Sequence, residues 1–228
     1  MRALIVADGA VPSRVDLDAS WPGWSDGIGL VVAADGGALV ADGLGFSPDL
    51  VVGDGDSLGT DGIASFRERG IAVSLARADK DESDTELAVL AALARGADAL
   101  TIVAAFGGRL DHALANIWLL ALPALAGCPA ELLDGSTRVT LISALGGDPV
   151  RRVLAAGRSG DLVSLLPLGG DVAGIVTEGL VYPLRDEPLR IGPSRGLSNL
   201  RARGAQEVAV SVGSGRLLVI EAPASLDR

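Results

Sequence analysis

The sequence predicts an α/β protein in which an N-terminal domain with a doubly wound, mostly parallel sheet precedes a smaller all-β sandwich. Two observations predict this class. Up to about residue 135, apolar runs of strand length alternate with helical patterns, as in a parallel sheet covered on both faces. After Asp134 the chain changes to short β runs separated by Gly and Pro, without a useful helical period. With 228 residues, 49% of them hydrophobic, the chain is long enough for both cores. We expect two domains, the first at residues 1–137 and the second at residues 138–228.

In the first domain, each expected strand is followed by a segment of helical or loop character. We expect Gly96 to cap the C-terminal end of one helix, and Leu87, Leu90, Ala91 and Ala94 to form its apolar stripe. The expected strands are 3–7, 30–34, 50–52, 71–75, 99–104 and 131–133; the expected helices are 38–42, 62–69, 81–95 and 111–122, with a loop and short helix in 12–29.

The last helix of this domain has start and stop signals of its own. Asp111 is the expected N-cap, because its side chain can accept a backbone hydrogen bond, and Pro123 is expected to stop the helix. In the second domain, the segment 212–216 is typical of a hairpin turn. The expected β runs are 137–143, 161–166, 174–177, 189–191, 207–212 and 216–221.

Composition excludes several classes of function. A net charge of −10 argues against a nucleic-acid partner, which requires a basic surface. Cys128 is the sole cysteine, which excludes an intramolecular disulfide and a cysteine-based zinc cluster. Lys80 is the sole lysine and is not set in a Walker A motif, so the chemistry of P-loop enzymes is excluded. No apolar run is long enough to span a bilayer, and the first strand is too short for a signal peptide, so we expect a cytoplasmic protein without a membrane partner.

Acidic and glycine-rich clusters follow four of the expected strands, at 35–37, 53–57, 79–84 and 107–112. The carboxyl ends of parallel strands meet at one edge of the sheet, where open α/β sheets bind ligands. Asp54 and Asp56 repel each other unless a cation lies between them, and carboxylate oxygens suit Mg²⁺. Asp81 and Asp84, three residues apart at a helix start, are expected to face the same side. Helix capping would explain Asp81 alone, but a shared acidic metal site explains all the clusters.

Basic residues complete the predicted site. Arg109 follows two glycines, so its fork of donors can approach phosphate oxygens closely; the alternative is a surface ion pair with Asp111. His112, the sole histidine, fits either a phosphate or base contact or ordinary packing. Aspartates, Mg²⁺, one lysine and one arginine without a P-loop indicate phosphoryl-type transfer from a nucleotide, which needs charge neutralisation and positioning.

Four of these segments resemble, in order and spacing, the motifs of the thiamine pyrophosphokinase (thiamine diphosphokinase) family. Two further segments of the β domain extend the resemblance over most of the chain. The six segments are AADGGA at 33–38, PDLVVGDGDSL at 48–58, DKDESDTE at 79–86, GRLDH at 108–112, EGLVYPL at 178–184 and GLSN at 196–199.

The resemblance implies an α/β domain that binds nucleotide and Mg²⁺, a β-sandwich for thiamine binding and dimerisation, and a homodimer with active sites at the subunit interface. It implies transfer of pyrophosphate from ATP to the hydroxyl of thiamine, giving thiamine diphosphate and AMP. The implied residues are Asp54, Asp56, Asp84, Arg109 and Asp111 for catalysis; Asp54, Asp56, Asp81, Asp84 and Asp111 for Mg²⁺; Asp35, Gly36, Gly37, Ser57, Lys80, Arg109 and His112 for the nucleotide; and Tyr182, Ser198 and Asn199 for thiamine.

The implied thiamine contact is chemically reasonable, because the aromatic face of Tyr182 suits a cationic thiazolium ring; the alternative is a tyrosine packed in the β core. Two residues depart from the family pattern. Gly55 stands where a bulky aromatic is usual, and Leu200 where a glutamate is common. The rival functions are a metal-dependent nucleotide phosphohydrolase, a non-catalytic nucleotide- or thiamine-binding regulator, and a transferase acting on another alcohol.

Overall fold

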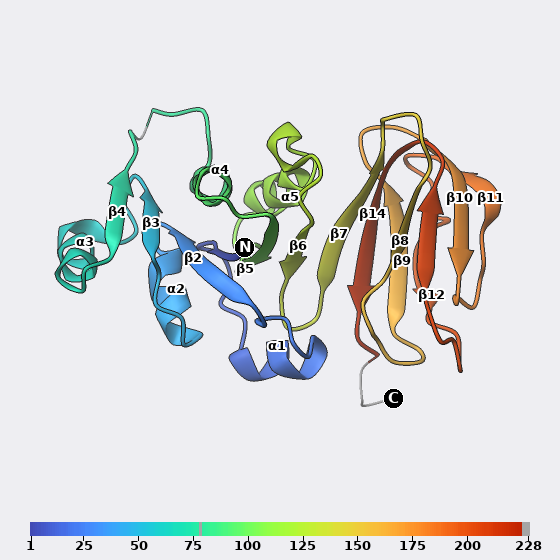
Figure 1. The fold of residues 1–228 in the computed structure, drawn as a ribbon, viewed down its shortest axis with the longest axis horizontal. Coiled ribbons are helices and arrows are strands. Elements are labelled where there is room, and N and C mark those ends of the chain that lie inside the picture. Colours follow the sequence, from blue (N-terminus) through green and yellow to red (C-terminus); the bar gives the residue numbers. More distant parts are fainter. Residues whose placement is uncertain (78, 225–228) are drawn as a thin grey trace. The chain divides into compact units, whose positions relative to one another are not determined.

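The computed structural model describes residues 1–77 and 79–224, and the chain divides into two compact units, Met1–Gly135 and Ser136–Arg228. The first unit holds a parallel sheet with helices and the second holds antiparallel strands (Figure 1), so the predicted fold class is confirmed. Among the described residues, no helix has both the length and the apolar character needed to cross a membrane.

The first unit is built on six parallel strands in the order β6-β5-β1-β2-β3-β4. The central strand β1 pairs with β2 on one side and with β5 on the other, so the strand order reverses between β1 and β5. Both faces of these strands are covered, which explains their nearly continuous apolar sequences. The strands are β1 (Arg2–Val6), β2 (Ile28–Ala34), β3 (Leu50–Gly53), β4 (Ala72–Leu75), β5 (Ala99–Val103) and β6 (Ala130–Leu133).

Helices cover this sheet from two sides, with α4 and α5 on one side and α1 and α2 on the other (Figure 1). The core on the α1 and α2 side contains Trp21 and Trp24 packed against apolar strand residues such as Leu4 and Val31. The helices are α1 (Arg14–Ser20), α2 (Gly37–Gly43), α3 (Gly59–Glu68), α4 (Asp84–Ala94) and α5 (Leu110–Leu119), followed by the 3₁₀ helix η1 (Pro123–Leu125).

The start and the buried face of α4 differ from the sequence prediction. The helix begins at Asp84, because the side chain of Ser83 accepts a hydrogen bond from the amide of Glu86 and so forms the N-cap. Asp81 therefore precedes the helix, and the argument that it shares a helix face with Asp84 was wrong. The residues that pack inward are Thr85, Ala88, Val89 and Ala92, and not the predicted stripe of Leu87, Leu90, Ala91 and Ala94. Small side chains allow α4 to contact β1, β2 and β3 closely, while the leucines lie at its flanks.

The prediction that Asp111 caps α5 was also wrong. Arg109 has the extended backbone of the N-cap position, and Asp111 lies inside the first turn, where its carboxylate accepts from the amide of His112. A carboxylate in this position still complements the helix dipole. The helix ends at Leu119, and Pro123 begins the short η1, as expected of a residue that cannot continue an α-helix.

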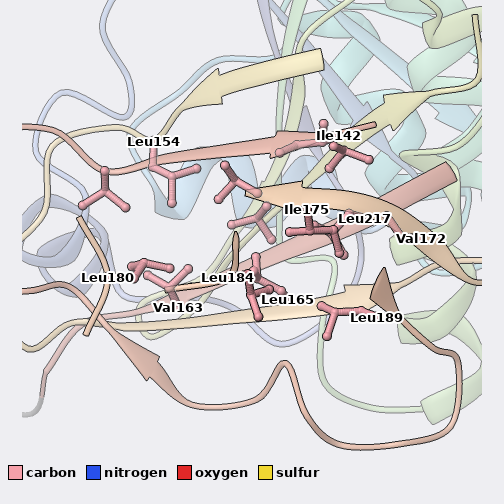
Figure 2. Close-up of a cluster of buried hydrophobic side chains, with 14 of the residues drawn as sticks. Ile142, Leu154, Val163, Leu165, Val172, Ile175, Leu180, Leu184, Leu189 and Leu217 are labelled. Carbon is pink, nitrogen blue, oxygen red and sulfur yellow. The ribbon is translucent and has the colours of Figure 1, made fainter. Parts of the chain in front are cut away.

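The second unit is a sandwich of antiparallel strands, with β12-β9-β14-β7 in one layer and β11-β10-β13-β8 in the other. Its core draws from both layers, as with Leu165 and Leu217 from the first and Ile175 and Leu189 from the second (Figure 2). The sequence prediction missed β8 and β12, and its β run at 189–191 overlaps β11 only at Leu189. The strands are β7 (Arg138–Ala144), β8 (Val150–Val153), β9 (Leu162–Pro167), β10 (Val172–Glu178), β11 (Arg185–Leu189), β12 (Asn199–Leu200), β13 (Ala209–Val212) and β14 (Gly215–Ala222).

The hairpin predicted at 212–216 does not form, because β13 and β14 belong to different layers. β13 pairs with β8 and β10, whereas β14 pairs with β7 and β9. The linking segment crosses close to β10, where Gly213 donates to the carbonyl of Ala173, and an added Cβ on Gly213 would lie 3.1 Å from the Cα of Gly174. The glycines therefore serve a close backbone crossing and not a tight turn.

Candidate active site

The carboxyl ends of β1, β2, β3 and β5, together with the start of α4 and the first turns of α5, surround a pocket of about 770 Å³. This is the edge of the sheet at which the sequence placed a site. Of the predicted site residues in this unit, those that line the pocket are Asp35, Asp54, Asp56, Ser57, Lys80, Asp84, Arg109 and His112. Gly36, Gly37, Asp81 and Asp111 are not among the lining residues.

Three aspartates from separate elements converge in this pocket. Asp35 follows β2, Asp54 follows β3 and Asp84 begins α4, and one carboxylate oxygen from each lies within 4.8 Å of the others. The backbone of Asp35 has φ +44°, a left-handed conformation that aspartate tolerates better than most residues. Such a conformation at a strand end turns the chain sharply. The trio therefore depends on local backbone geometry as well as on sequence.

Asp35 is the buried member of the trio, with 3% of its surface exposed. Its Oδ2 accepts from the amide of Ser57 at 3.0 Å, while its Oδ1 is buried and has no hydrogen-bond partner among the described residues. Burial raises the pKa of Asp35, the Ser57 amide opposes this, and a hydrogen bond with Asp56 raises the pKa further. The same interaction lowers the pKa of Asp56. A buried carboxyl with an unsatisfied oxygen is suited to a cationic ligand.

Lys80 is the cation that balances this trio within the chain. Its Nζ lies 2.6 Å from Oδ1 of Asp84, and its side chain is only 13% exposed. Burial lowers the pKa of Lys80, but the hydrogen bond to Asp84 and the charges of Asp84, Asp54 and Asp35 outweigh it, so the pKa is raised overall. Lys80 is therefore fully charged at neutral pH. It competes with any other cation for Asp84.

Gly53 allows the three carboxylates to approach. It ends β3 with φ +150°, and a Cβ added there would lie 2.9 Å from the Cβ of Asp35 and 3.2 Å from Oδ1 of Asp84. The first distance is shorter than side chains tolerate, and the backbone conformation disfavours any L-residue. Glycine is therefore required at the point where β2, β3 and α4 meet.

Arg109 lines the pocket from the start of α5, but it forms a bidentate ion pair with Asp111. The Arg109 Nη2 to Asp111 Oδ2 distance is 2.6 Å, and the two side chains are 73% and 64% exposed. This hydrogen bond lowers the pKa of Asp111. An exposed pair is weak, so phosphate oxygens can replace Asp111 as the partner of Arg109. His112 also lines the pocket, and its amide donates to Asp111.

The pocket is also lined by residues that were absent from the predicted site, among them Asp8, Glu82 and Asn116. Asp8 and Gly9 follow β1 as Asp54 and Gly55 follow β3, so the strand-end pattern could have identified Asp8 from sequence. Asn116 lies in α5 with 8% of its surface exposed, and its Nδ2 donates to the carbonyl of Ala105 at 2.9 Å. A single asparagine in an apolar helix forms no comparable sequence pattern that would identify it as a pocket residue.

The predicted thiamine residues lie together in the second unit. Tyr182 is 66% exposed, so it is not a core aromatic. Asn199 is buried and holds the backbone of Tyr182 at both ends: Oδ1 accepts from its amide at 3.0 Å and Nδ2 donates to its carbonyl at 2.7 Å. Ser198 has φ +57°, and its amide donates to Oγ of Ser164. Because its polar atoms are engaged, Asn199 acts here by positioning Tyr182.

A carboxylate trio balanced by one lysine, at the strand ends of a parallel sheet, defines a phosphotransferase-type site. Comparison with known proteins identifies the family. Residues 24–130 match "Thiamin pyrophosphokinase, catalytic domain" and residues 152–217 match "Thiamin pyrophosphokinase, vitamin B1 binding domain". The chain belongs to the thiamin pyrophosphokinase family, and is therefore an enzyme that transfers pyrophosphate to thiamine.

Individual relatives agree with this assignment. The chain is 25% identical over 192 residues to the thiamine pyrophosphokinase of Bacillus subtilis (strain 168), covering 83% of this chain and 87% of the relative. A crystal structure of thiamine pyrophosphokinase from B. subtilis superposes with a TM-score of 0.82 at 24% identity, covering 98% of this chain and 100% of the other. A thiamin pyrophosphokinase structure from Geobacillus thermodenitrificans gives 0.79 at 26% identity, with 99% of each chain covered.

Gly53→Ala is expected to lower kcat/KM for thiamine diphosphate formation by about tenfold or more, because the added methyl group forces Asp35 and Asp84 apart. Gly43→Ala is the matched control, since a Cβ at the end of α2 meets no atom within 4 Å. Steady-state kinetics, with circular dichroism to verify folding, measure both variants. Equal activity of the two variants would contradict the role assigned to Gly53.

Proposed function

We propose that the chain catalyses Mg²⁺-dependent transfer of pyrophosphate from ATP to the hydroxyl of thiamine, with thiamine diphosphate and AMP as products. The observation that carries the proposal is the acidic trio of Asp35, Asp54 and Asp84 in a pocket of the family's catalytic domain. The absence of a P-loop in the sequence leaves this trio as the main phosphate-handling device.

The chemistry of the trio fits Mg²⁺. Three carboxylates supply hard oxygen donors, and the buried, unpartnered Oδ1 of Asp35 gains a partner when a cation binds. We propose Asp35, Asp54 and Asp84 as holding residues, with Asp56 in the same pocket lining. Asp81 and Asp111 lie outside the pocket lining and have no place in this set. When bound, Mg²⁺ supplies charge neutralisation on the phosphates.

Lys80 and Arg109 then handle the polyphosphate. Lys80 is charged, lines the pocket and is paired with Asp84, so it can exchange that carboxylate for a phosphate oxygen. Arg109 offers a fork of donors at the other side of the pocket. Both offset negative charge that develops on the bridging oxygen as AMP leaves. One of the aspartates orients the attacking hydroxyl of thiamine, and Asp84, which lines the pocket at the start of α4, is our candidate.

The β-sandwich supplies the thiamine contacts in this proposal. The exposed ring of Tyr182, held by Asn199, presents a face to the cationic thiazolium, and Ser198 adds a polar contact. The match of residues 152–217 to a vitamin B1 binding domain supports this role. We further propose that two copies of the chain form a homodimer whose active sites lie at the subunit interface.

The reaction itself is tested by incubating the protein with ATP and Mg²⁺, with and without thiamine, and measuring AMP and thiamine diphosphate. We expect both products in equal amounts, and only when thiamine and Mg²⁺ are present. AMP or ADP release without thiamine would indicate a phosphohydrolase and contradict the proposal. Absence of turnover would indicate a binding protein or another acceptor.

The metal set is tested by a matched pair of substitutions. Asp84→Asn is expected to lower kcat/KM by about 100-fold or more and to raise the Mg²⁺ concentration needed for half-maximal activity, because it removes a trio oxygen. Asp81→Asn makes the same change three residues earlier, outside the pocket lining, and is expected to stay within a fewfold of the parent chain. An equally inactive Asp81→Asn would contradict the set drawn from the structure.

Tyr182→Ala is expected to raise KM for thiamine by about tenfold while leaving KM for ATP within twofold, because loss of the ring removes a cation–π contact. Tyr182→Phe keeps the aromatic face and is the matched control, expected to retain thiamine affinity. Because Tyr182 is exposed, neither change disturbs the core. Equal effects of Tyr182→Ala on both substrates would contradict a thiamine-specific role.

A further inference from the structure

Asp8 is a pocket carboxylate to which the proposed reaction assigns no role. It follows the end of β1 by two residues and lines the pocket from an exposed position. Its carboxylate forms no hydrogen bond or ion pair with any residue that the structure describes, and it is not part of the acidic trio. An unpaired carboxylate that faces a ligand pocket is available to a ligand that donates hydrogen bonds.

The position of Asp8 in the sheet indicates which ligand group lies near it. The chain proceeds from β1 through β2 and β3 to β4 on one side and then returns to β5 on the other side of β1. Asp8 therefore lies at the reversal of strand order, where doubly wound sheets hold the nucleotide in the crevice beyond the strand ends. The trio belongs to β2, β3 and α4, on one side of this point.

Several glycines and alanines line the pocket that Asp8 faces. These small lining residues include Gly9, Ala10, Gly107 and Gly108. Gly36 lies against the carboxylate, since an added Cβ there would be 2.5 Å from Oδ1 of Asp8. Because glycine has no side chain, such a wall leaves room for a sugar or a base to approach the backbone closely.

The charge of Asp8 indicates which part of the nucleotide lies near it. An uncompensated carboxylate repels phosphate oxygens, whereas two neighbouring hydroxyl groups can both donate to it. We propose that Asp8 is a specificity-determining residue that accepts hydrogen bonds from the ribose hydroxyls of the nucleotide donor. This inference rests on the proposed function in so far as ATP is the donor.

The test is calorimetric titration of the protein with ATP and with 2′,3′-dideoxy-ATP, in Mg²⁺ and without thiamine. For the parent chain we expect the dideoxy nucleotide to bind about tenfold or more weakly, the usual effect of losing a hydrogen bond to a charged group. In Asp8→Ala the two dissociation constants should agree within about twofold. Asp8→Asn, whose amide oxygen still accepts, should keep part of the difference. Glu68→Gln, which removes an exposed carboxylate at the end of α3, should keep all of it.

An Asp8→Ala variant that still discriminates tenfold against the dideoxy nucleotide would overturn the inference, as would a parent chain without a preference or without ATP binding. Failure of the proposed reaction is distinguishable, because it would appear as ATP binding without formation of thiamine diphosphate. Asp8 is exposed, so its replacement should leave the thermal unfolding temperature within about 2 °C of that of Glu68→Gln.

Discussion

The mutual repulsion of Asp35, Asp54 and Asp84 is the constraint on which this site depends. Three carboxylates within 4.8 Å of one another are unfavourable unless the backbone imposes their approach and cations offset their charge. The backbone does so through the left-handed turn at Asp35 and through Gly53, where no side chain fits. Lys80 offsets part of the charge. The site is thus strained and incompletely neutralised, which is the state that favours cation binding.

The packing of α4 positions Asp84, the third member of this trio. The helix places Ala88 and Ala92 against the sheet, and these small side chains allow a close approach to β1, β2 and β3. Asp84 lies one turn before Ala88 on the same side of the helix, so the packing that buries the alanines also directs Asp84 toward the strand ends. The N-cap of Ser83 fixes where the helix begins. A bulkier inward face would move the carboxylate away from Asp35 and Asp54.

The sequence predicted the fold class and the edge of the sheet at which the site forms, because strand periods and strand-end glycines are local signals. Of the three aspartates that meet, the predicted metal set contained Asp54 and Asp84 but not Asp35. Asp81 was grouped with Asp84 on an assumed helix face, and the N-cap at Ser83 removes that face. Asp35 was assigned to the nucleotide, although its burial beside Asp54 follows only from the β2–β3 pairing. The apolar stripe of α4 was also predicted wrongly. A helix that is apolar all round shows no preferred face in its sequence.

Charge balance in the pocket connects the trio with the substrate. Of the described residues that line it, six carry carboxylates and two carry permanent positive charge, in a chain with a net charge of −10. A polyphosphate entering such a pocket alone would meet repulsion from most of its walls, and Lys80 and Arg109 are already paired with Asp84 and Asp111. Favourable binding therefore requires a cation together with the nucleotide, so that the trio carboxylates become its ligands and Asp84 releases Lys80, while phosphate oxygens replace Asp111 as the partner of Arg109. On this argument, the acidity of the chain selects for a metal–nucleotide complex as the donor.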